Sequence, residues 1–374
     1  MADNNENKVL NVPHLRFPEF SGEWEMASLQ DIAAINPKSD QLQNTFIYID
    51  LEAVEKGELR KIQEIMREEA PSRAQRVINN NDILFQCVRP YQKNNYIHKI
   101  LNTSNQQWVA STGYAQIRTT ESPNYIYHLL NTDGFNRKVM VRCTGSSYPA
   151  INSEDLATIR FYYTPDKKEQ FKISRLLDLI DERIATQNKI IERYESLIRG
   201  IAQNVIRSNK PNVLLSECLE CSSSTLQESD VCENGTYPVY GANGIVGYLD
   251  DYNTEDEAVH IIKDGSGVGT VSYATGRCSA TGTLNTLQAK DGYLLQYLYY
   301  MLKVFNFEPY KTGMAIPHIY FKDYGKAKIF CPSYTEQLKY VELLSAIDNK
   351  LSAEQSILTN LSLQKQYLLR QMFI

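Results

Sequence analysis

Two long stretches of the chain place apolar residues at spacings that alternate strictly between four and three. The first stretch begins at Ile173 and the second at Tyr340. This alternation is the heptad pattern of helices that pair along a narrow apolar seam. The pattern therefore predicts two long helices, within residues 164–210 and 331–374, each with a seam of about 33 residues.

The two predicted seams match each other position by position. The first consists of Ile173, Leu177, Ile180, Ile184, Gln187, Ile191, Tyr194, Ile198, Ile201 and Val205. The second consists of Tyr340, Leu344, Ile347, Leu351, Glu354, Leu358, Leu361, Lys365, Leu368 and Met372. Gln187 and Glu354 stand in the middle at equivalent places, and a polar seam residue fixes the pairing register at some cost in stability. One such helix alone would more simply lie on its own domain, but two matched seams favour pairing with each other.

The sequence around the two stretches is an internal repeat. Eight residues recur 167 positions later, between Pro332 and Asp348; in the first copy they are Pro165, Glu169, Gln170, Lys172, Leu176, Leu177, Ile180 and Asp181. Upstream, the pattern Thr-Gly-x3-Pro-x-Ile at Thr144–Ile151 recurs at Thr312–Ile319. The chain is therefore predicted to be two copies of one unit, each ending in a helix that opens at a proline.

Antiparallel pairing is the simpler geometry for two such copies. It relates them by a pseudo-two-fold axis, with the globular parts at opposite ends of an antiparallel coiled coil. At 1.5 Å per residue the paired helices would be about 50 Å long, which is nearly one and a half turns of B-DNA. The helices would then act as a ruler.

The globular parts are predicted to span residues 15–163 and 211–330, after a disordered start over residues 1–14. Short β-rich runs such as Phe46–Ile49 and Val259–Ile262 alternate there with turn residues. We therefore expect an α+β protein in which two mixed α/β domains are separated by the two helices.

The overall charge limits how the chain can bind nucleic acid. The formal net charge is −5 and the isoelectric point is near 5.7, which counts against coating DNA through the overall electrostatic field. Any DNA affinity must therefore come from local basic patches. The chain has 43% hydrophobic and 22% charged residues, no apolar run long enough to cross a bilayer and no secretory signal. A cytoplasmic protein without a membrane contact is expected.

No motif predicts catalysis or a bound cofactor. The glycine-rich segment Gly265–Thr270 lacks the lysine of a phosphate-binding loop, and a strand-like sequence follows it. Cys331–Tyr334 superficially resembles an adenine-methyltransferase motif, but its repeat counterpart is the entrance to a helix. Cys218 and Cys221 have metal-ligand spacing, yet no second close pair completes a zinc site. We therefore expect no metal ion and no catalytic residue in this chain.

Three stretches of sequence resemble one known family. They are the opening Val12–Phe20 with Gly22–Glu25, the glycine-rich Tyr237–Tyr248, and the ending Leu368–Phe373. Together they resemble the specificity subunit of type I restriction-modification enzymes. The resemblance implies two target-recognition domains, each reading one half of a bipartite, gapped site in double-stranded DNA.

The same resemblance implies which partners the chain has. Members of this family bind two methyltransferase subunits, which use S-adenosylmethionine, and restriction subunits, which use ATP and Mg. These activities and cofactors belong to the partners, so the resemblance implies a non-catalytic specificity subunit whose helices set the gap and help dock the methyltransferase subunits.

Base reading requires polar side chains that reach base edges, and phosphate contacts come from Lys, Arg and small hydroxyls. The turn 89–94 is the main candidate: Arg89 would pair with guanine, and Gln86 or Asn94 with adenine. The candidate DNA-binding residues are Gln86, Arg89, Lys93, Asn94, Thr144, Ser146, Ser147, Lys263, Ser266, Tyr273, Arg277, Lys311 and Thr312. The plain alternatives are a solvated loop for the turn 89–94 and, for the repeated Thr-Gly segments, a turn that seats the helix. The basic stretch Arg60–Arg76 holds three glutamates, so we interpret it as a solvated, charge-balanced helix.

Two other classes of function remain open from the residues alone. One is a coiled-coil interaction scaffold whose globular domains bind peptide or glycan, which the acidic isoelectric point favours slightly. The other is a stand-alone enzyme, which would require a catalytic constellation that the sequence does not display.

Overall fold

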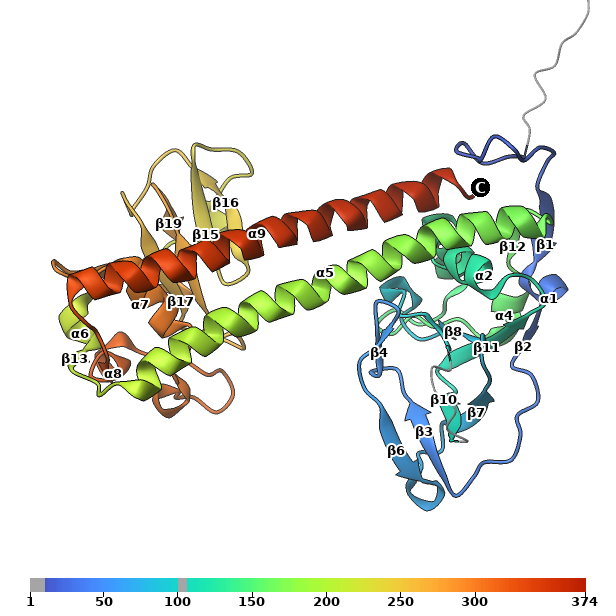
Figure 1. Ribbon diagram of the computed structural model, residues 1–374, viewed down its shortest axis with the longest axis horizontal. Coiled ribbons are helices and arrows are strands. Elements are labelled where there is room, and N and C mark those ends of the chain that lie inside the picture. The colour runs from blue at the N-terminus through green and yellow to red at the C-terminus, as the bar shows by residue number, and fades with distance from the viewer. Residues whose placement is uncertain (1–10, 100–105) are drawn as a thin grey trace, which may run out of the picture. The chain divides into compact units, whose positions relative to one another are not determined.

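The computed structural model describes residues 11–99 and 106–374. The chain forms two compact units, Met1–Thr186 with Leu358–Ile374, and Gln187–Ile357. Each unit therefore holds one globular domain together with part of each long helix, which Figure 1 draws in green and red. The expected disordered start, residues 1–14, lies outside the described residues as far as residue 10. Asn11 itself accepts a hydrogen bond from the Trp24 backbone N–H at 2.8 Å.

The two long helices are α5, Lys167–Ser208, with 42 residues, and α9, Tyr334–Gln371, with 38 residues. Both begin two residues after the repeated prolines. At the start of α5 the Asp166 carboxylate accepts the backbone N–H of Lys168 at 2.8 Å. At the start of α9 the Ser333 backbone N–H donates to the Glu336 carboxylate at 3.3 Å. Such contacts satisfy donors that a helix N-terminus leaves unpaired.

The domain of the first unit is built on two four-stranded sheets. One has the order β2 (Ala33–Ile35), β11 (Tyr114–Thr119), β8 (Ile83–Gln86), β9 (Tyr96–Ile97), with antiparallel neighbours throughout. The other has the order β6 (Gln63–Met66), β3 (Thr45–Ile49), β10 (Gln107–Ser111), β7 (Ala74–Ile78), and its β3–β10 pair is parallel. Two-stranded pairs are β1 (Glu25–Ser28) with β12 (Arg160–Tyr163), and β4 (Val54–Glu55) with β5 (Glu58–Leu59). The helices are α1 (Leu29–Ile32), α2 (Pro123–Leu130), α3 (Asp133–Arg142) and α4 (Ser153–Ala157), with 3₁₀ turns η1 (Arg67–Glu69) and η2 (Pro90–Gln92).

The domain of the second unit repeats this frame in a smaller form. Its four-stranded sheet has the order β14 (Leu219–Ser223), β20 (Leu284–Ala289), β17 (Ala258–Ile262), β18 (Val271–Ala274). The other sheet, β16 (Gly244–Leu249), β15 (Tyr237–Gly241), β19 (Ser279–Ala280), again contains one parallel pair, and β13 (Val213–Leu214) pairs with β21 (Lys328–Ile329). The helices are α6 (Leu215–Cys218), α7 (Leu295–Leu302) and α8 (Phe321–Tyr324), with 3₁₀ turns η3 (Glu228–Asp230) and η4 (Glu308–Tyr310). Within the described residues, the last strand of this second sheet is β19, and an isolated antiparallel bridge between Thr254 and Cys278 takes the place of β7. The prediction of two mixed α/β domains is confirmed.

In the first unit the helices pack against each other and against the domain. One buried cluster contains Ile173 and Leu177 near the start of α5, Leu368 near the end of α9 with Met372 just after it, and aromatic residues of the domain. The Phe373 ring lies 6.2 Å from the Trp24 ring. Early residues of α5 meet late residues of α9, so the helices are antiparallel here. Each fully buried side chain of this size contributes about 1.5–3 kcal/mol through burial.

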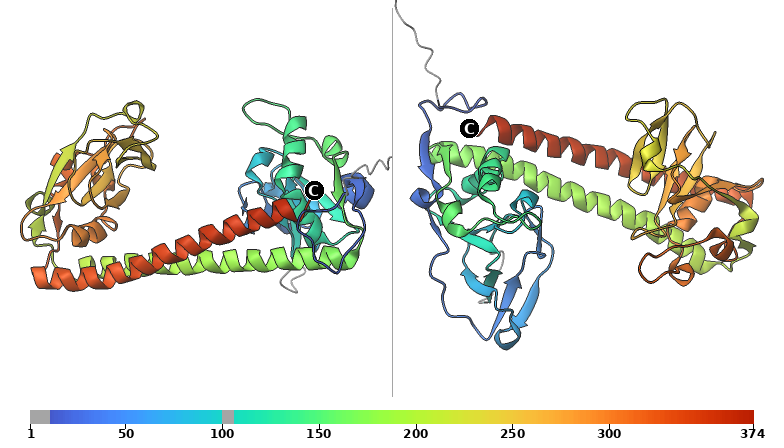
Figure 2. Two further views of the ribbon diagram at one scale, coloured as in Figure 1. Left: turned by 90° about the horizontal axis from the view of Figure 1, so that it is seen from above. Right: turned by 180° about the vertical axis from the view of Figure 1, so that it is seen from behind.

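The second unit contains the polar centre of the two seams. The Gln187 side chain is 7% exposed, and its Nε2 donates to the Glu354 backbone carbonyl at 3.1 Å and to the Glu354 carboxylate. Ile191, Leu344 and Leu351 are buried nearby. All twenty seam residues, in both units, are buried or half-buried, and Figure 2 shows the helices side by side in each unit from two further sides.

Among the helices in the described part of the chain, none combines the length and apolar character that crossing a bilayer requires.

Candidate nucleic-acid interface

The repeated Thr-Gly segments form the same closed loop in both domains. Thr144 and Ala150 exchange two backbone hydrogen bonds of 2.9 Å, and Thr312 and His318 exchange two of 2.9 and 2.8 Å. The glycines at the second position have φ angles of +88° and +87°. At Gly313 an added Cβ would lie 2.3 Å from the Ile316 carbonyl oxygen. The recurring glycine therefore reflects a turn that other residues cannot adopt without strain.

Each Thr-Gly loop is joined to a neighbouring turn by a backbone hydrogen bond. In the first domain the Arg89 backbone N–H donates to the Pro149 carbonyl at 2.7 Å, and in the second the Gly265 N–H donates to the Pro317 carbonyl at 3.0 Å. The two candidate turns, 89–94 and 265–270, are thus structurally equivalent. The structure brings each of them against the Thr-Gly loop of its own domain, so each domain has one composite two-loop surface.

The two surfaces share a backbone and differ in side chains. Arg89 and Lys93 have positive φ angles of 54° and 52°, where the second domain has Gly265 and Gly269 at 95° and 90°. The left-handed conformation costs a non-glycine residue roughly 1–2 kcal/mol, and such strain is concentrated at functional sites. The Arg89 guanidinium stacks 4.3 Å above the ring of Tyr148, which is 63% exposed. Of the candidates in the first domain, Arg89 is the one that this geometry favours most.

The structure places Gln86 inside the turn 89–94, so its predicted contact with adenine would require the turn to open. The side chain is 3% exposed. Its Nε2 donates to the Gln92 side chain at 3.0 Å, and its Oε1 accepts the Asn94 backbone N–H at 3.1 Å. Both ends of the amide are therefore occupied in holding the turn. Asn94 is half-buried and its Oδ1 accepts the Lys56 backbone N–H at 3.0 Å.

The Lys93 side chain extends to the start of α3. Its Nζ donates to the Asn131 carbonyl at 3.1 Å and to Asp133 at 2.7 Å. Asp133 also accepts from Arg370 of α9 at 3.2 Å, and the hydrogen bond from Lys93 is the main reason that the pKa of Asp133 is lowered. Lys93 is thus already paired, which leaves it less available to a phosphate than predicted.

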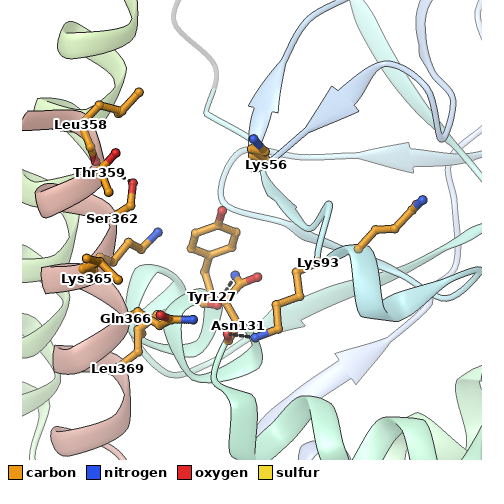
Figure 3. Close-up of a pocket in the computed structure, with 12 residues that line it drawn as sticks. Lys56, Lys93, Tyr127, Asn131, Leu358, Thr359, Ser362, Lys365, Gln366 and Leu369 are labelled. Carbon is orange, nitrogen blue, oxygen red and sulfur yellow. Dashed lines mark hydrogen bonds between the residues drawn. The ribbon is translucent and has the colours of Figure 1, made fainter. Parts of the chain in front are cut away.

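A groove of about 560 Å³ lies beside Lys93, between α2 and the C-terminal part of α9 (Figure 3). Lys56, Tyr127 and Lys365 also line it. The second unit has a groove of about 450 Å³ in the equivalent place, between α7 and α5, where Tyr299 replaces Tyr127. The first groove is lined by lysines without a carboxylate, whereas the second is also lined by Glu195 and Asp348.

The candidate residues of the second domain fall into two groups. Lys263 and Ser266 lie at the Gly265 turn, at one end of the β17–β18 pair. Tyr273 and Arg277 lie toward the other end, where Tyr273 bonds the Glu257 carboxylate and Arg277 bonds Glu255 at 3.2 Å. Burial is the main reason that the pKa of the Tyr273 hydroxyl is raised, and Glu257 adds to it. The structure therefore does not bring these candidates into one patch.

The candidates on the Thr-Gly loops are the most accessible ones. Thr144, Ser146, Ser147 and Thr312 are exposed. Lys311 is half-buried and its Nζ bonds Glu308 at 2.6 Å. The hydroxyls of the first loop can therefore reach a phosphate without any rearrangement.

Two glutamines of the repeat attach each domain to its helix. The buried Gln170 accepts the Ser122 backbone N–H at 3.0 Å and donates to the Thr164 carbonyl at 2.8 Å. The buried Gln337 makes the equivalent pair of bonds, with the Leu294 N–H at 2.9 Å and the Pro332 carbonyl at 3.0 Å. Their recurrence was visible in the sequence, but their partners were not.

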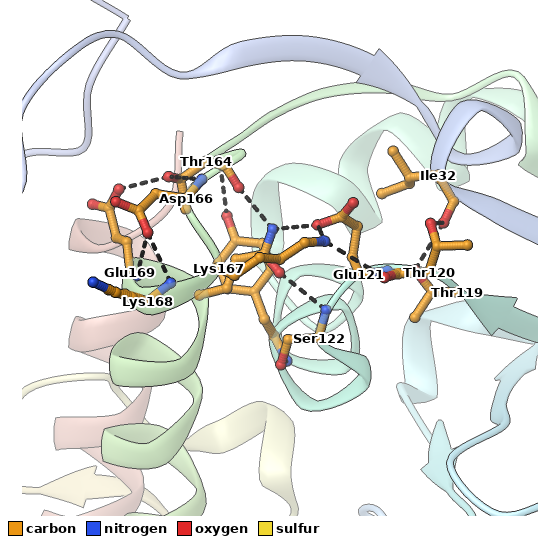
Figure 4. A network of polar contacts seen from close by, with 12 residues as sticks. Ile32, Thr119, Thr120, Glu121, Ser122, Thr164, Asp166, Lys167, Lys168 and Glu169 are labelled. Atoms are coloured by element: carbon orange, nitrogen blue, oxygen red, sulfur yellow. Dashed lines mark hydrogen bonds and ion pairs between the residues drawn. The ribbon is translucent and has the colours of Figure 1, made fainter.

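Figure 4 draws the polar network at the start of α5, which includes Thr164, Lys167 and Glu169. The fully buried Glu169 accepts the Thr164 hydroxyl at 2.6 Å and pairs with Arg16 at 2.7 Å. Lys167, in the first turn of α5, pairs with Glu121 just before α2. These contacts set the orientation of the first domain on α5.

The expectation of a helix over Arg60–Arg76 is wrong. The stretch contains β6, η1 and most of β7. Of the three glutamates, Glu64 lies on β6 while Glu68 and Glu69 lie in η1, so the balance of charges in the sequence did not indicate a helix. This misassignment also hid Arg76, which is half-buried on β7.

Within the described ranges, no group of three or more His, Cys, Asp or Glu side chains is placed to hold a metal ion. Burial raises the pKa of the Cys218 thiol to about 12 and that of Cys221 to about 11. Thiols with such pKa values stay protonated near neutral pH when no metal ion is bound.

Comparison with known proteins gives the family. The model of the type I restriction modification DNA specificity domain matches residues 21–196 and 215–362. A putative type I specificity subunit of Mycoplasma genitalium is 23% identical over 272 residues, covering 67% of this chain and 70% of that protein. The specificity subunit of a type I restriction enzyme of Escherichia coli is 27% identical over 116 residues, covering 31% of this chain and 29% of that protein.

Solved structures show the same fold. The crystal structure of a type I restriction-modification S subunit from M. genitalium has a TM-score of 0.64 at 17% identity, covering 97% of this chain and 99% of that one. A chain from a study of assembly and conformational transition of a type I system has a TM-score of 0.53 at 21% identity, covering 92% of this chain and 96% of that one. Since the matched family model spans both domains, this chain belongs to the family of type I restriction modification DNA specificity domains.

Proposed function

We propose that this chain is the specificity subunit of a type I restriction-modification enzyme and that each of its domains reads one half of a gapped DNA site. The observation that carries the proposal is the two-loop surface, which occurs once in each domain with the same backbone contacts and different side chains. Two readers of different half-sites require that combination, because a common frame positions the loops and the side chains discriminate between bases.

Membership of the family supports a proposal about which subunits this chain binds and which activities those subunits carry. In this proposal the chain works in the cytoplasm, binding two methyltransferase subunits and the restriction subunits. S-adenosylmethionine, ATP and Mg act in those partners, and this chain contributes recognition without catalysis. The register of α5 against α9, which the Gln187–Glu354 bond supports, would set the length of the gap.

Methylome sequencing tests the proposal directly. A host that expresses this chain with its methyltransferase subunit should acquire N6-methyladenine in one split motif. A chain in which residues 15–163 come from another family member should change one half of that motif and leave the other half and the gap unchanged. Two unchanged half-sites would contradict the assignment of domains to half-sites. No split motif, together with no DNA enrichment by the assembled complex, would favour an interaction scaffold.

A further inference from the structure

Arg76 is a half-buried cation without an anionic partner. It lies on β7, the edge strand of its sheet, where it stands opposite Ala110 of β10. Its Nε is buried and has no hydrogen-bond acceptor among the residues that the structure describes. Over the same residues no carboxylate forms an ion pair with it, whereas Arg118 of the neighbouring sheet pairs with Asp82 at 2.8 Å.

The position of Arg76 adjoins the two-loop surface of the first domain. The turn after β10 links the start of β7 to Cys87, which follows β8: the Thr112 backbone N–H donates to the Arg73 carbonyl at 2.9 Å, and the Cys87 N–H donates to the Gly113 carbonyl at 3.0 Å. Arg89 follows Cys87 by two residues. The Cys87 carbonyl accepts the backbone N–H of Ile151, at the end of the Thr-Gly loop, at 3.0 Å. Arg76 therefore borders the segment from which both loops extend.

The Nε of Arg76 is shielded from solvent, so its two terminal Nη groups are the donors that a ligand can reach. Burial is also the main reason that the pKa of Arg76 is lowered. The edge of guanine offers two acceptors, O6 and N7, in the spacing of a guanidinium fork. Since the sheet holds the inner part of the side chain, Arg76 has limited freedom, which suits a base edge better than a phosphate on a variable backbone.

We propose that Arg76 is a specificity-determining residue that reads a guanine in the half-site of the first domain. The inference rests on the proposed function and adds to it a residue outside the two loops. In the second domain an isolated bridge between Thr254 and Cys278 stands in the place of β7, with a threonine in it, so its half-site would be read without such a contact.

The test compares Arg76→Gln and Arg76→Lys with the control Arg73→Gln, which removes the same charge from an exposed position just before β7. Each full chain is assembled with its methyltransferase subunits. Binding is measured by fluorescence anisotropy on a set of duplexes in which every base pair of the motif is replaced in turn. Melting temperatures of the chains report on folding.

Both Arg76 variants should lose about 10- to 100-fold of the discrimination at one G·C pair in the first domain's half-site. Discrimination in the other half-site should stay unchanged, and Arg73→Gln should retain the wild-type pattern. Arg76→Lys keeps the charge, so its loss would identify the bidentate geometry as the cause.

Three results would overturn the proposal. Affinity that falls equally for all sequences, with a salt dependence reduced by about one unit, would make Arg76 a phosphate contact. Wild-type discrimination in both variants would leave it without a role in reading. Unfolding of both variants would make it a structural cation. In each of these cases the wild-type complex still selects a split motif, whereas failure of the proposed function would remove that motif from the wild-type complex as well.

Discussion

The two globular domains form the same pair of loops with the same backbone hydrogen bonds, but the side chains on these loops differ. In both domains backbone hydrogen bonds close the Thr-Gly loop. A second turn is bound to this loop by one hydrogen bond, from a backbone N–H of the turn to the carbonyl of the loop proline. At the two left-handed positions of that turn, the first domain has Arg89 and Lys93 and the second has Gly265 and Gly269. The comparison shows that main-chain hydrogen bonds are enough to fix the loop conformation. The two left-handed positions can therefore hold charged side chains in the first domain and no side chain in the second.

The largest expected effect tests whether the two seams contribute equally to folding. Leu177 and Leu344 are repeat counterparts and both are fully buried, so Leu177→Ala and Leu344→Ala should each lower the free energy of unfolding by about 2–5 kcal/mol. Chemical denaturation followed by circular dichroism measures the change. The control Leu363→Ala removes a side chain that is 58% exposed and should shift stability by less than about 0.5 kcal/mol. A small effect at only one of the two leucines would show that the seams are not equivalent.

A smaller effect concerns one buried histidine in each domain. Burial lowers the pKa of both His98 and His260 to about 4. Because these folded-state pKa values lie below that of an unfolded histidine, the associated stability is complete above pH 6.5 and declines as the pH falls from 6.5 to 4. Each histidine should account for up to about 3 kcal/mol of that decline.

The measurement is urea denaturation of the wild-type chain, His98→Gln and His260→Gln at intervals between pH 7 and pH 4. Each variant should flatten the decline by a similar amount, since both rings are fully buried. A decline that neither variant alters would assign the acid sensitivity to other groups.

The smallest expected effect exchanges the strained positions between the domains. Gly265→Arg should cost roughly 1–2 kcal/mol, because it introduces a side chain at a φ of 95°. Arg89→Gly removes comparable strain but also the stacking on Tyr148, so its stability should change by less than about 1 kcal/mol. The DNA affinity of Arg89→Gly should nevertheless fall by about tenfold. Wild-type affinity in that variant would mean that Arg89 serves the turn alone.

The sequence predicted the two helices and the two domains, but few of the side-chain contacts in the candidate interface. Alternating spacings of four and three revealed the two helices, because a seam is a local pattern. The burial of Gln86 results from its hydrogen bonds with Gln92 and Asn94, and the spacing of residues in the sequence does not reveal these bonds. Arg76 was missed for a related reason: its burial comes from β10 and the neighbouring sheet, which are remote in sequence.

The hydrogen bond between Gln187 and Glu354 joins two residues that are 167 positions apart, which is also the offset of the repeat. Each of them therefore faces its own duplicate. An amide can meet an amide or a carboxylate there, but a protein assembled from two second halves would press two carboxylates together in a shielded place. The Gln187–Glu354 pair therefore makes the centres of the two helices complementary, and it disfavours the pairing of two second halves with each other.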